Sequence, residues 1–367
     1  MHVDEVELRV IRLPYRSVFK TSFAAEAEKH AVITTVRSAG TEGYGEGVMD
    51  PLPAYREESI VGALHLLREA LVPSLLGDGC DDPMTLGDAW SRWRGNPMAK
   101  AALELAVWDC HARQLGVPLR TLLDGDRTEI PVGASLGMNP VPETLASVAR
   151  HVEQGYKRIK LKIEPGWDLD LLSAVRAEFP EIELTVDANS AYTLADIEVL
   201  RKIDQFGLHY IEQPLHWDDL TDHAILAPQL QTPICLDETL TSPARTRAAL
   251  DLGACAVVNV KVGRVGGLAA TKRIHDLCVS RGVPMWCGGM LETGIGRAHN
   301  IHAATMPGFV YPGDTASASR TYARDITEQA LEATDGIMPV PSGPGIGVTI
   351  DHPFLESVTE SVEVIRR

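Results

Sequence analysis

The chain has 367 residues, of which 45% are hydrophobic and 23% charged, values that exclude a fibrous or disordered protein. Thirty-four Lys and Arg against fifty Asp and Glu give a net charge of −16, so we expect a surface that repels a phosphate backbone and no nucleic-acid partner. A chain of this length is expected to form two domains, or one large barrel with an appendage.

The N-terminal residues mix charges with apolar side chains, and no run approaches eighteen consecutive apolar residues, so we expect no signal peptide and no membrane span. Six cysteines are scattered along the chain without a Cys-x-x-Cys pair. They are Cys80, Cys110, Cys235, Cys255, Cys278 and Cys287. In a chain of this size the pattern is typical of reduced thiols, and we expect a cytoplasmic protein.

The first part of the chain predicts an α+β capping domain, residues 1–125. Runs rich in β-forming residues indicate strands at residues 3–13 and 31–38, joined by a polar and aromatic loop at residues 17–28, with a Gly-rich return at residues 43–47. Residues 98–115 have apolar positions at helical spacing, and Gly116 supplies a stop signal.

From about residue 129 the pattern changes to short runs rich in Val and Ile, each followed by an amphipathic stretch. The predicted strands are residues 130–135, 158–162, 183–187, 210–212, 234–236, 256–260 and 283–287, with an ambiguous eighth strand at residues 309–311. A period of about 25 residues fits one strand, one helix and two short loops. We expect an α/β fold, a TIM-like modified (β/α)7β barrel over residues 126–320.

The alternative to a barrel is an open doubly wound sheet, but no Gly-x-Gly-x-x-Gly fingerprint follows any predicted strand. After residue 320 the repeat stops, and we expect residues 321–367 to return to the capping domain.

Charged residues stand in phase at the predicted strand ends. Lys162, Asp187, Glu212 and Asp237 follow one another at intervals of 25, and Lys261 comes 24 residues later. Equivalent points on successive barrel strands meet at one mouth, where the chemistry of such barrels lies. Five charges in phase are unlike the single solvated charge expected at a loop entrance.

Three of these residues predict a metal site. The carboxylates of Asp187, Glu212 and Asp237 would repel one another unless a cation lay between them. Oxygen ligands without His or Cys select a hard ion, so we expect Mg²⁺ there, with Mn²⁺ or another divalent ion able to replace it.

The lysines indicate the reaction. Lys160 and Lys162 point to the same face of their strand, and Lys261 lies four strands away across the ring. Bases on opposite faces of a metal-held carboxylate suit abstraction of the α-proton through an enediolate, and they permit racemisation. We expect Lys160 to lower the pKa of Lys162 by charge repulsion. The alternative is that the lysines only anchor the carboxylates in inert salt bridges.

Other motifs are weaker. Ser135 lies within a Gly-x-Ser-x-Gly pattern, but Pro140 and Pro142 delay the helix that a nucleophile elbow needs, so we expect Ser135 to bond a substrate carbonyl instead. His299 and His302 lack the spacing of a zinc helix. Phe19, Phe23 and Tyr55 are expected either to contact substrate from the capping domain or to pack in it.

Over nearly its whole length the sequence resembles the enolase superfamily, and within it the o-succinylbenzoate synthase / N-succinylamino acid (N-acylamino acid) racemase family. The motifs that show this are residues 102–109, 158–167, 186–189, 211–214, 235–238, 263–267 and 286–294. The resemblance implies Mg²⁺ on Asp187, Glu212 and Asp237, with Lys162 and Lys261 as the acid/base pair. It implies N-acylamino acid racemisation, syn-dehydration to o-succinylbenzoate in menaquinone synthesis, or both.

The same resemblance places further residues at the site. Lys160, Asn189 and Glu238 are expected as auxiliary residues, and Gly289, Met290 and Leu291 as substrate contacts beside Ser135. We expect a small carboxylate as substrate and a homo-oligomer as the assembly.

Two positions depart from the family pattern, since Thr239 stands where Ser is expected and Val262 where Pro is usual. The seventh strand lacks the Asp-x-Asp of dipeptide epimerases, which favours a succinylated or N-acyl substrate. A dipeptide epimerase or muconate cycloisomerase remains the enzymatic alternative, and a noncatalytic barrel that binds a metal and a carboxylate remains the alternative from another class.

Overall fold

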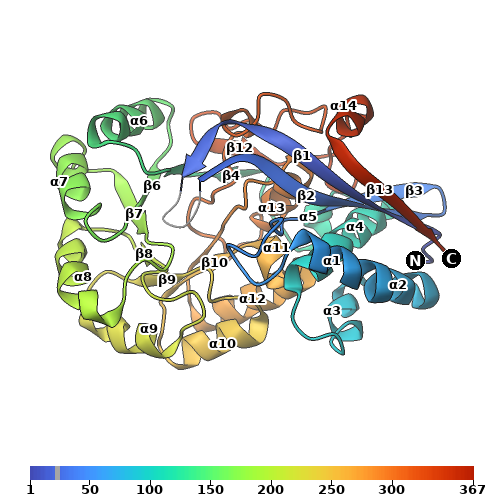
Figure 1. The fold of residues 1–367 in the computed structure, drawn as a ribbon, viewed down its shortest axis with the longest axis horizontal. Helices are drawn as coiled ribbons and strands as arrows, with labels where there is room; N and C mark the ends of the chain where they lie inside the picture. The colour runs from blue at the N-terminus through green and yellow to red at the C-terminus, as the bar shows by residue number, and fades with distance from the viewer. Residues whose placement is uncertain (21–24) are drawn as a thin grey trace.

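The computed structural model describes residues 1–20 and 25–367, without the side chains of residues 19, 20 and 25. The molecule has two regions. One contains an antiparallel sheet packed with helices, and the other contains a parallel sheet surrounded by helices (Figure 1). Both ends of the chain lie beside the antiparallel sheet (Figure 1).

The antiparallel sheet has the strand order β13-β1-β2-β3. Its strands are β1 (Glu5–Lys20), β2 (Ala25–Ser38), β3 (Thr41–Gly47) and β13 (Thr359–Arg366). Pairing of β1 with β2 continues to Lys20 opposite Ala25, so the loop predicted at residues 17–28 is wrong in extent. Residues 16–18 are exposed, and the alternation that marks a half-buried strand is therefore missing there.

Helices cover one side of this sheet. They are α1 (Ile60–Leu66), the π-helical η1 (Leu67–Leu71), α2 (Val72–Asp78), the 3-10 turn η2 (Pro83–Thr85), α3 (Leu86–Ala89), α4 (Pro97–Leu115) and α5 (Leu119–Leu122). The continuous run Ile60–Asp78 is long and apolar enough to cross a membrane, with a mean hydropathy of 1.4. It also contributes Leu67, Leu71 and Leu75 to a buried core, as helices of globular proteins do, so length and composition alone do not make it a membrane span.

The predicted helix at residues 98–115 is confirmed as α4. Its stop is Gly116, which adopts the left-handed conformation that glycine tolerates best. The glycines of β3 have a packing reason, because α4 lies directly on this strand. A Cβ at Gly43 would come within 2.2 Å of the Cys110 backbone nitrogen, and one at Gly45 within 2.3 Å of the Ala102 carbonyl oxygen.

The second region is a seven-stranded parallel sheet in the order β11-β10-β9-β8-β7-β6-β5. The strands are β5 (Ala134–Leu136), β6 (Arg158–Lys162), β7 (Glu183–Asp187), β8 (Ile211–Glu212), β9 (Ile234–Leu236), β10 (Val257–Val260) and β11 (Met285–Cys287). The predicted strands at residues 158–162, 183–187 and 234–236 have these bounds. The run 130–135 is split between β5 and β4 (Glu129–Pro131), which pairs with β12 (Ile337–Pro339).

Helices follow the strands as in a barrel of βα units. They are α6 (Val141–Glu153), α7 (Leu169–Glu178), α8 (Ile197–Ile203), α9 (Thr221–Leu226), α10 (Pro243–Asp251), α11 (Val262–Val265), α12 (Leu268–Arg281) and α13 (Gly294–Ala303). Short 3-10 turns are η3 (Leu194–Asp196), η4 (Asp204–Phe206) and η5 (Ala227–Gln229). The α/β barrel prediction is thus confirmed.

The predicted eighth strand at residues 309–311 is wrong, because this segment forms only isolated bridges. Phe309 bridges to Met285 of β11, and Gly313 bridges to Val132 just before β5. Backbone bonds from Val310 and Asp314 to β11 carbonyls hold it in place. An irregular segment therefore joins the two edges of the seven-stranded sheet.

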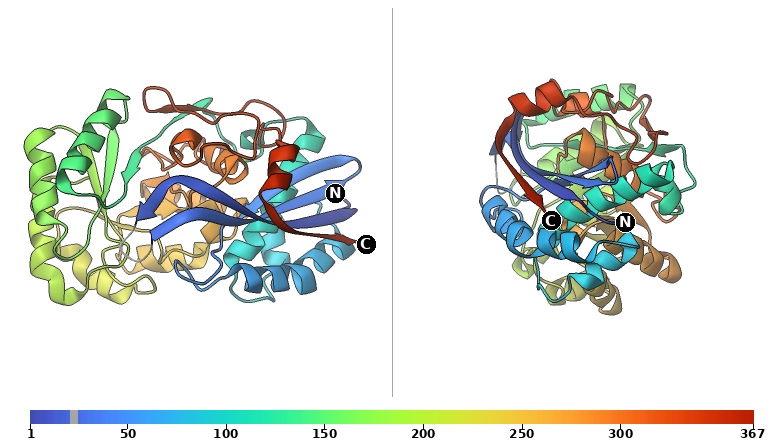
Figure 2. Two further views of the ribbon diagram at one scale, coloured as in Figure 1. Left: turned by 45° about the horizontal axis from the view of Figure 1, so that its top comes forward. Right: turned by 90° about the vertical axis from the view of Figure 1, so that its right-hand side faces the viewer.

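The C-terminal part crosses back over the molecule. It contains η6 (Ala318–Arg320), β12, α14 (His352–Ser357) and β13, and β13 pairs with β1 at the edge of the antiparallel sheet (Figure 2). The division into residues 1–125, 126–320 and 321–367 stays a prediction.

Candidate active site

The carboxyl ends of the parallel strands bring charged residues side by side. Lys162 at the end of β6 is in register with Asp187 on β7, and Asp187 is in register with Glu212 on β8. Asp237 comes directly after β9 and Lys261 directly after β10. All five side chains are buried, so the even spacing along the chain corresponds to one buried rim of the sheet.

A cavity of about 760 Å³ opens over this rim. Its barrel wall includes Lys160, Lys162, Asp187 and Lys261, and residues of the antiparallel sheet form the opposite wall. Glu212 and Asp237 are absent from the lining and lie behind the lysines.

Lys160 is surrounded by carboxylates. Its Nζ lies 2.9 Å from Glu212 Oε2, 2.6 Å from Asp314 Oδ2 and 3.4 Å from Asp187 Oδ2, and 4.7 Å from the centre of the Trp286 ring. Burial alone would lower the pKa of Lys160, but Asp314 and Glu212 raise it. Three carboxylates thus offset the charge of Lys160, and its expected action on Lys162 stays a prediction.

Lys162 and its neighbours form a chain of contacts. Lys162 Nζ donates to Asp187 Oδ2 and Asn189 Oδ1, both at 2.6 Å, and Asn189 Nδ2 donates to Glu238 Oε1 at 2.8 Å. Although burial raises the pKa of Asp187, Lys162 and Lys160 lower it to about 2. Asp187 is therefore a carboxylate at neutral pH, and Asn189 fixes the position of both Lys162 and Glu238.

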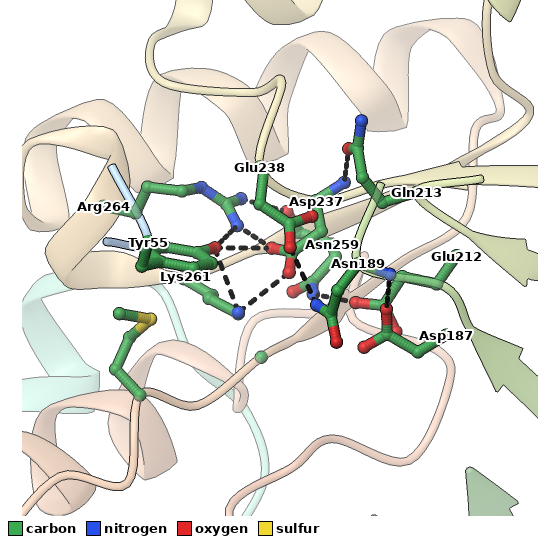
Figure 3. A network of polar contacts seen from close by, with 12 residues as sticks. Tyr55, Asp187, Asn189, Glu212, Gln213, Asp237, Glu238, Asn259, Lys261 and Arg264 are labelled. Carbon is green, nitrogen blue, oxygen red and sulfur yellow. Dashed lines mark hydrogen bonds and ion pairs between the residues drawn. The ribbon is translucent and has the colours of Figure 1, made fainter. Parts of the chain in front are cut away.

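The opposite lysine has a different set of partners (Figure 3). Lys261 Nζ lies 2.8 Å from Asp237 Oδ2 and 3.1 Å from the Tyr55 hydroxyl oxygen. Arg264 pairs with Asp237, and its Nη1 donates to the same hydroxyl at 3.1 Å. Burial alone would lower the pKa of Lys261, but Tyr55 and Glu238 raise it.

The two lysines stand on opposite sides of the carboxylates. In the sheet order, β7, β8 and β9 lie between β6, which ends in Lys162, and β10, which precedes Lys261. Both lysines line the cavity. A substrate held over the middle strands would have one amine on each side of it.

The carboxylate set fits a hard divalent cation, and in the described structure Lys160, Lys162 and Lys261 neutralise these carboxylates. Among residues 1–20 and 25–367, no three His, Cys, Asp or Glu side chains lie together as a ready-made metal site. The buried Oε2 of Glu238 has no hydrogen-bond donor in the described structure, and the buried Oδ2 of Asp237 faces the Lys261 ammonium at 2.8 Å. Burial and then the charge of Asp187 raise the pKa values of Glu212 and Glu238, a repulsion that a cation would relieve.

The predicted substrate contacts fall on both walls of the cavity. Ser135, Tyr55 and the consecutive residues Gly289, Met290 and Leu291 line it. Lys29 of β2 donates to the Met290 carbonyl at 2.9 Å, which ties the antiparallel sheet to this loop. Phe23 and the side chain of Phe19 lie outside the described residues, so their expected contacts stay predictions.

Comparison with known families agrees with this geometry. Residues 143–354 match the enolase C-terminal domain-like family, and residues 5–124 match the N-terminal domain of the mandelate racemase / muconate lactonizing enzyme family. The chain belongs to the enolase superfamily.

Relatives within the superfamily are similar over their full length. The chain is 52% identical to an N-succinylamino acid racemase of Thermus thermophilus, covering 98% of both chains. It is 48% identical to an o-succinylbenzoate synthase of Geobacillus kaustophilus, over 100% of this chain and 98% of the relative. A crystal structure of an enolase superfamily member from Listeria innocua superposes with a TM-score of 0.97 at 40% identity, covering 100% and 99% of the two chains.

The two departures from the superfamily pattern keep their local structure. Thr239 accepts a hydrogen bond from Gln213 Nε2 at 2.7 Å, so its hydroxyl does what a serine hydroxyl at this position could do. Val262 begins α11, and the Lys261 carbonyl accepts from the Val265 backbone at 3.0 Å. A helical turn therefore holds the backbone of Lys261 without a proline.

Gly288, directly after β11, has a steric role. A Cβ at Gly288 would lie 2.2 Å from Asn259 Oδ1 and 2.8 Å from Lys261 Cγ. A side chain at residue 288 would therefore displace Asn259 and Lys261.

Two site residues were missed by the sequence analysis. Asp314 bonds Lys160 and also Arg158, whose Nη2 donates to it at 2.5 Å, and Arg264 pairs with Asp237. Asp314 follows an irregular segment instead of a strand, so it does not share the regular spacing of about 25 residues that marks the other carboxylates. Arg264 comes three residues after Lys261, and this helical spacing was an available signal.

Proposed function

We propose that this chain abstracts the proton α to a substrate carboxylate and racemises N-succinylamino acids or other N-acylamino acids, forms o-succinylbenzoate by syn-dehydration, or does both. The observation that supports this most directly is the pair Lys162 and Lys261, which line one cavity from opposite sides of three buried carboxylates. The identity of 52% with an N-succinylamino acid racemase and 48% with an o-succinylbenzoate synthase supports both activities.

Asp187, Glu212 and Asp237 would hold a divalent ion, Mg²⁺ or a substitute such as Mn²⁺. When bound, the ion supplies positive charge that offsets the negative charge developing on the substrate carboxylate. Lys162 and Lys261 lie 2.6 and 2.8 Å from Asp187 and Asp237. With these carboxylates holding an ion, the two amines would be available to the substrate.

Lys162 and Lys261 would then act as the two acid/base catalysts. One amine takes the α-proton to give an enediolate, and the other returns a proton to the opposite face, which inverts the centre. In the dehydration to o-succinylbenzoate the proton and the hydroxyl leave from one face, and there we assign both roles to Lys162. It removes the α-proton and then donates a proton to the departing hydroxyl, so that water leaves. Lys160, Asn189 and Glu238 would position these groups, and Ser135 would bond the acyl carbonyl.

We propose that the protein is a cytoplasmic homo-oligomer that acts on a small carboxylate, without nucleic acid or membrane partners. We divide the chain into a capping domain at residues 1–125, a catalytic barrel at 126–320 and a returning segment at 321–367. A role in menaquinone synthesis would follow from the synthase activity.

The test is incubation of the Mg²⁺-loaded protein with one enantiomer of an N-succinylamino acid in D₂O. We expect loss of optical activity together with deuterium at the α-carbon. A dipeptide epimerase or a muconate cycloisomerase would instead act on its own substrate class and leave this one unchanged. A barrel that only binds the ligand would incorporate no deuterium from any substrate.

A further inference from the structure

Four arginines line one part of the cavity, and none has a carboxylate oxygen within 4 Å among the described residues. They are Arg16, Arg150, Arg297 and Arg320. The residues left out of the description, 21–24, include no Asp or Glu. By contrast, Arg158 and Arg264 beside the lysines are each paired with an aspartate. The cavity is also lined by Glu26, Asp50, Glu292 and Asp314, but none of these described carboxylates forms an ion pair with the four arginines.

Arg320 lies closest to the predicted acyl position. Its Nη2 donates to the Ser135 carbonyl at 3.4 Å, and its guanidinium lies 5.6 Å from the centre of the Tyr156 ring. Ser135 on β5 is in register with Lys160 on β6, and neighbouring strands are about 4.8 Å apart. An acyl group bonded near Ser135 would thus extend from the lysines toward Arg320.

Arg297 is a second positive charge near Arg320 in the cavity wall. Its side chain is buried, it donates to the Glu292 and Ala316 carbonyls, and its Nε has no hydrogen-bond partner in the described structure. Burial lowers the pKa of Arg320. Tyr156 and Asp314 partly offset this effect, and the charge of Arg297 lowers the pKa further. Asp314, which acts on Arg320, already bonds Lys160 and Arg158, and Asp325, which Arg297 influences, forms no ion pair with it in the part of the chain that is described. An incoming anion would relieve this repulsion.

The antiparallel sheet contributes to the same wall of the cavity. Arg16 of β1 lies next to the segment that carries Arg320, because the Arg16 backbone nitrogen donates to the Thr321 carbonyl at 2.8 Å. Tyr15 bridges to Tyr322, and their rings lie 5.7 Å apart. Two segments that are distant in sequence thus bring arginines to one wall.

We infer that this arginine cluster binds the terminal carboxylate of a dicarboxylic acyl group, with Arg320 as the specificity-determining residue. The inference rests on the proposed function and adds to it, since it names the group that selects a succinylated substrate over a neutral N-acyl one. The α-carboxylate and the terminal carboxylate would occupy opposite ends of one cavity, each facing its own cations.

The experiment compares two ligands of nearly the same shape, an N-succinylamino acid and its N-succinamoyl analogue, in which a neutral amide replaces the terminal carboxylate. Racemisation kcat/KM and calorimetric affinity are measured for the Mg²⁺-loaded wild type, Arg320→Gln and Arg320→Lys. We expect Arg320→Gln to lower kcat/KM and affinity for the succinyl ligand by about ten- to hundredfold. Values for the succinamoyl ligand should stay within about twofold of wild type, and Arg320→Lys should retain part of the preference.

Arg324→Gln is the matched control, since this exposed arginine pairs with Asp351 away from the cavity, and it should leave both ligands unaffected. An equal loss for both ligands in Arg320→Gln, or no loss for either, would overturn the inference. A wild type that binds the two ligands equally would overturn it as well, whatever its activity. A wild type that racemises neither ligand would refute the proposed racemisation, while the calorimetric comparison would still test the arginine cluster.

Discussion

The hydroxyl oxygen of Tyr55 lies 3.1 Å from Nζ of Lys261, and the same ammonium lies 4.6 Å from the centre of the Tyr55 ring. Tyr55 comes from the N-terminal region and Lys261 from the barrel, so this contact joins the two regions at the mouth. Figure 3 shows that Arg264 and Asp237 meet at the same hydroxyl.

Tyr55→Phe should therefore affect one face of the reaction more than the other. Removing the hydroxyl takes a hydrogen-bond partner from Lys261 and leaves the contacts of Lys162 intact. We expect exchange of the α-proton served by Lys261 to slow by about tenfold, and exchange served by Lys162 to change less. Deuterium exchange rates for the separate enantiomers measure this, and equal slowing for both would contradict a specific role for the Tyr55–Lys261 contact.

Metal removal tests the carboxylate site. A chelator should abolish activity and Mg²⁺ or Mn²⁺ should restore it, because Asp187, Glu212 and Asp237 are proposed as its ligands. Asp237→Asn should weaken metal affinity by about tenfold or more, measured by calorimetry. Full activity of a metal-free preparation would refute the metal site.

Glu104 predicts a stability effect away from the cavity. This buried carboxylate on α4 accepts the Leu268 and Ala269 backbone N–H groups at the start of α12 and the Trp108 indole N–H, all at 2.8 Å. Glu104→Ala leaves these buried donors without an acceptor and should lower the free energy of unfolding by about 3–5 kcal/mol. Glu104→Gln keeps one acceptor oxygen and should lose less. Chemical denaturation measures both variants, and equal stability of wild type and Glu104→Ala would contradict this role.

His302 predicts a pH-dependent stability. It is fully buried in α13 and bonds the Arg120 backbone nitrogen and the Ile346 carbonyl, each at 3.2 Å. Burial lowers its pKa to about 3, so between about pH 6.5 and 3 the unfolded chain binds a proton that the folded chain does not. Stability contributed by neutral His302 is therefore lost as the pH falls, by about 2 kcal/mol at pH 5.

The measurement for His302 is the free energy of unfolding at pH 7 and pH 5 in wild type and His302→Gln. We expect the difference between the two pH values to shrink in the variant, since glutamine does not titrate. An unchanged difference would show that other groups cause the whole pH dependence.

The strands of the barrel were predictable because each is a short buried run, and the charged residues because they come at one fixed point of a repeating unit. Asp314 does not follow this pattern, because its segment is not a regular strand and is held by isolated bridges from Phe309 to Met285 and from Gly313 to Val132. The ion pair between Lys160 and Asp314 could therefore not be anticipated. Residues 17 and 18 belong to β1 although the sequence predicts a loop over residues 17–28, because the strand is exposed there and lacks the alternation of buried and exposed side chains.

Exchange by single-lysine variants tests the central claim, that Lys162 and Lys261 serve opposite faces of one α-carbon, most directly. Lys162→Ala and Lys261→Ala are each incubated with the separate enantiomers in D₂O, with metal binding and fold checked by calorimetry and circular dichroism. We predict that both variants lose racemisation and that exchange, where it persists, occurs for opposite enantiomers, because a base cannot reach through the substrate plane. Racemisation at the wild-type rate by either variant would contradict the opposed pair.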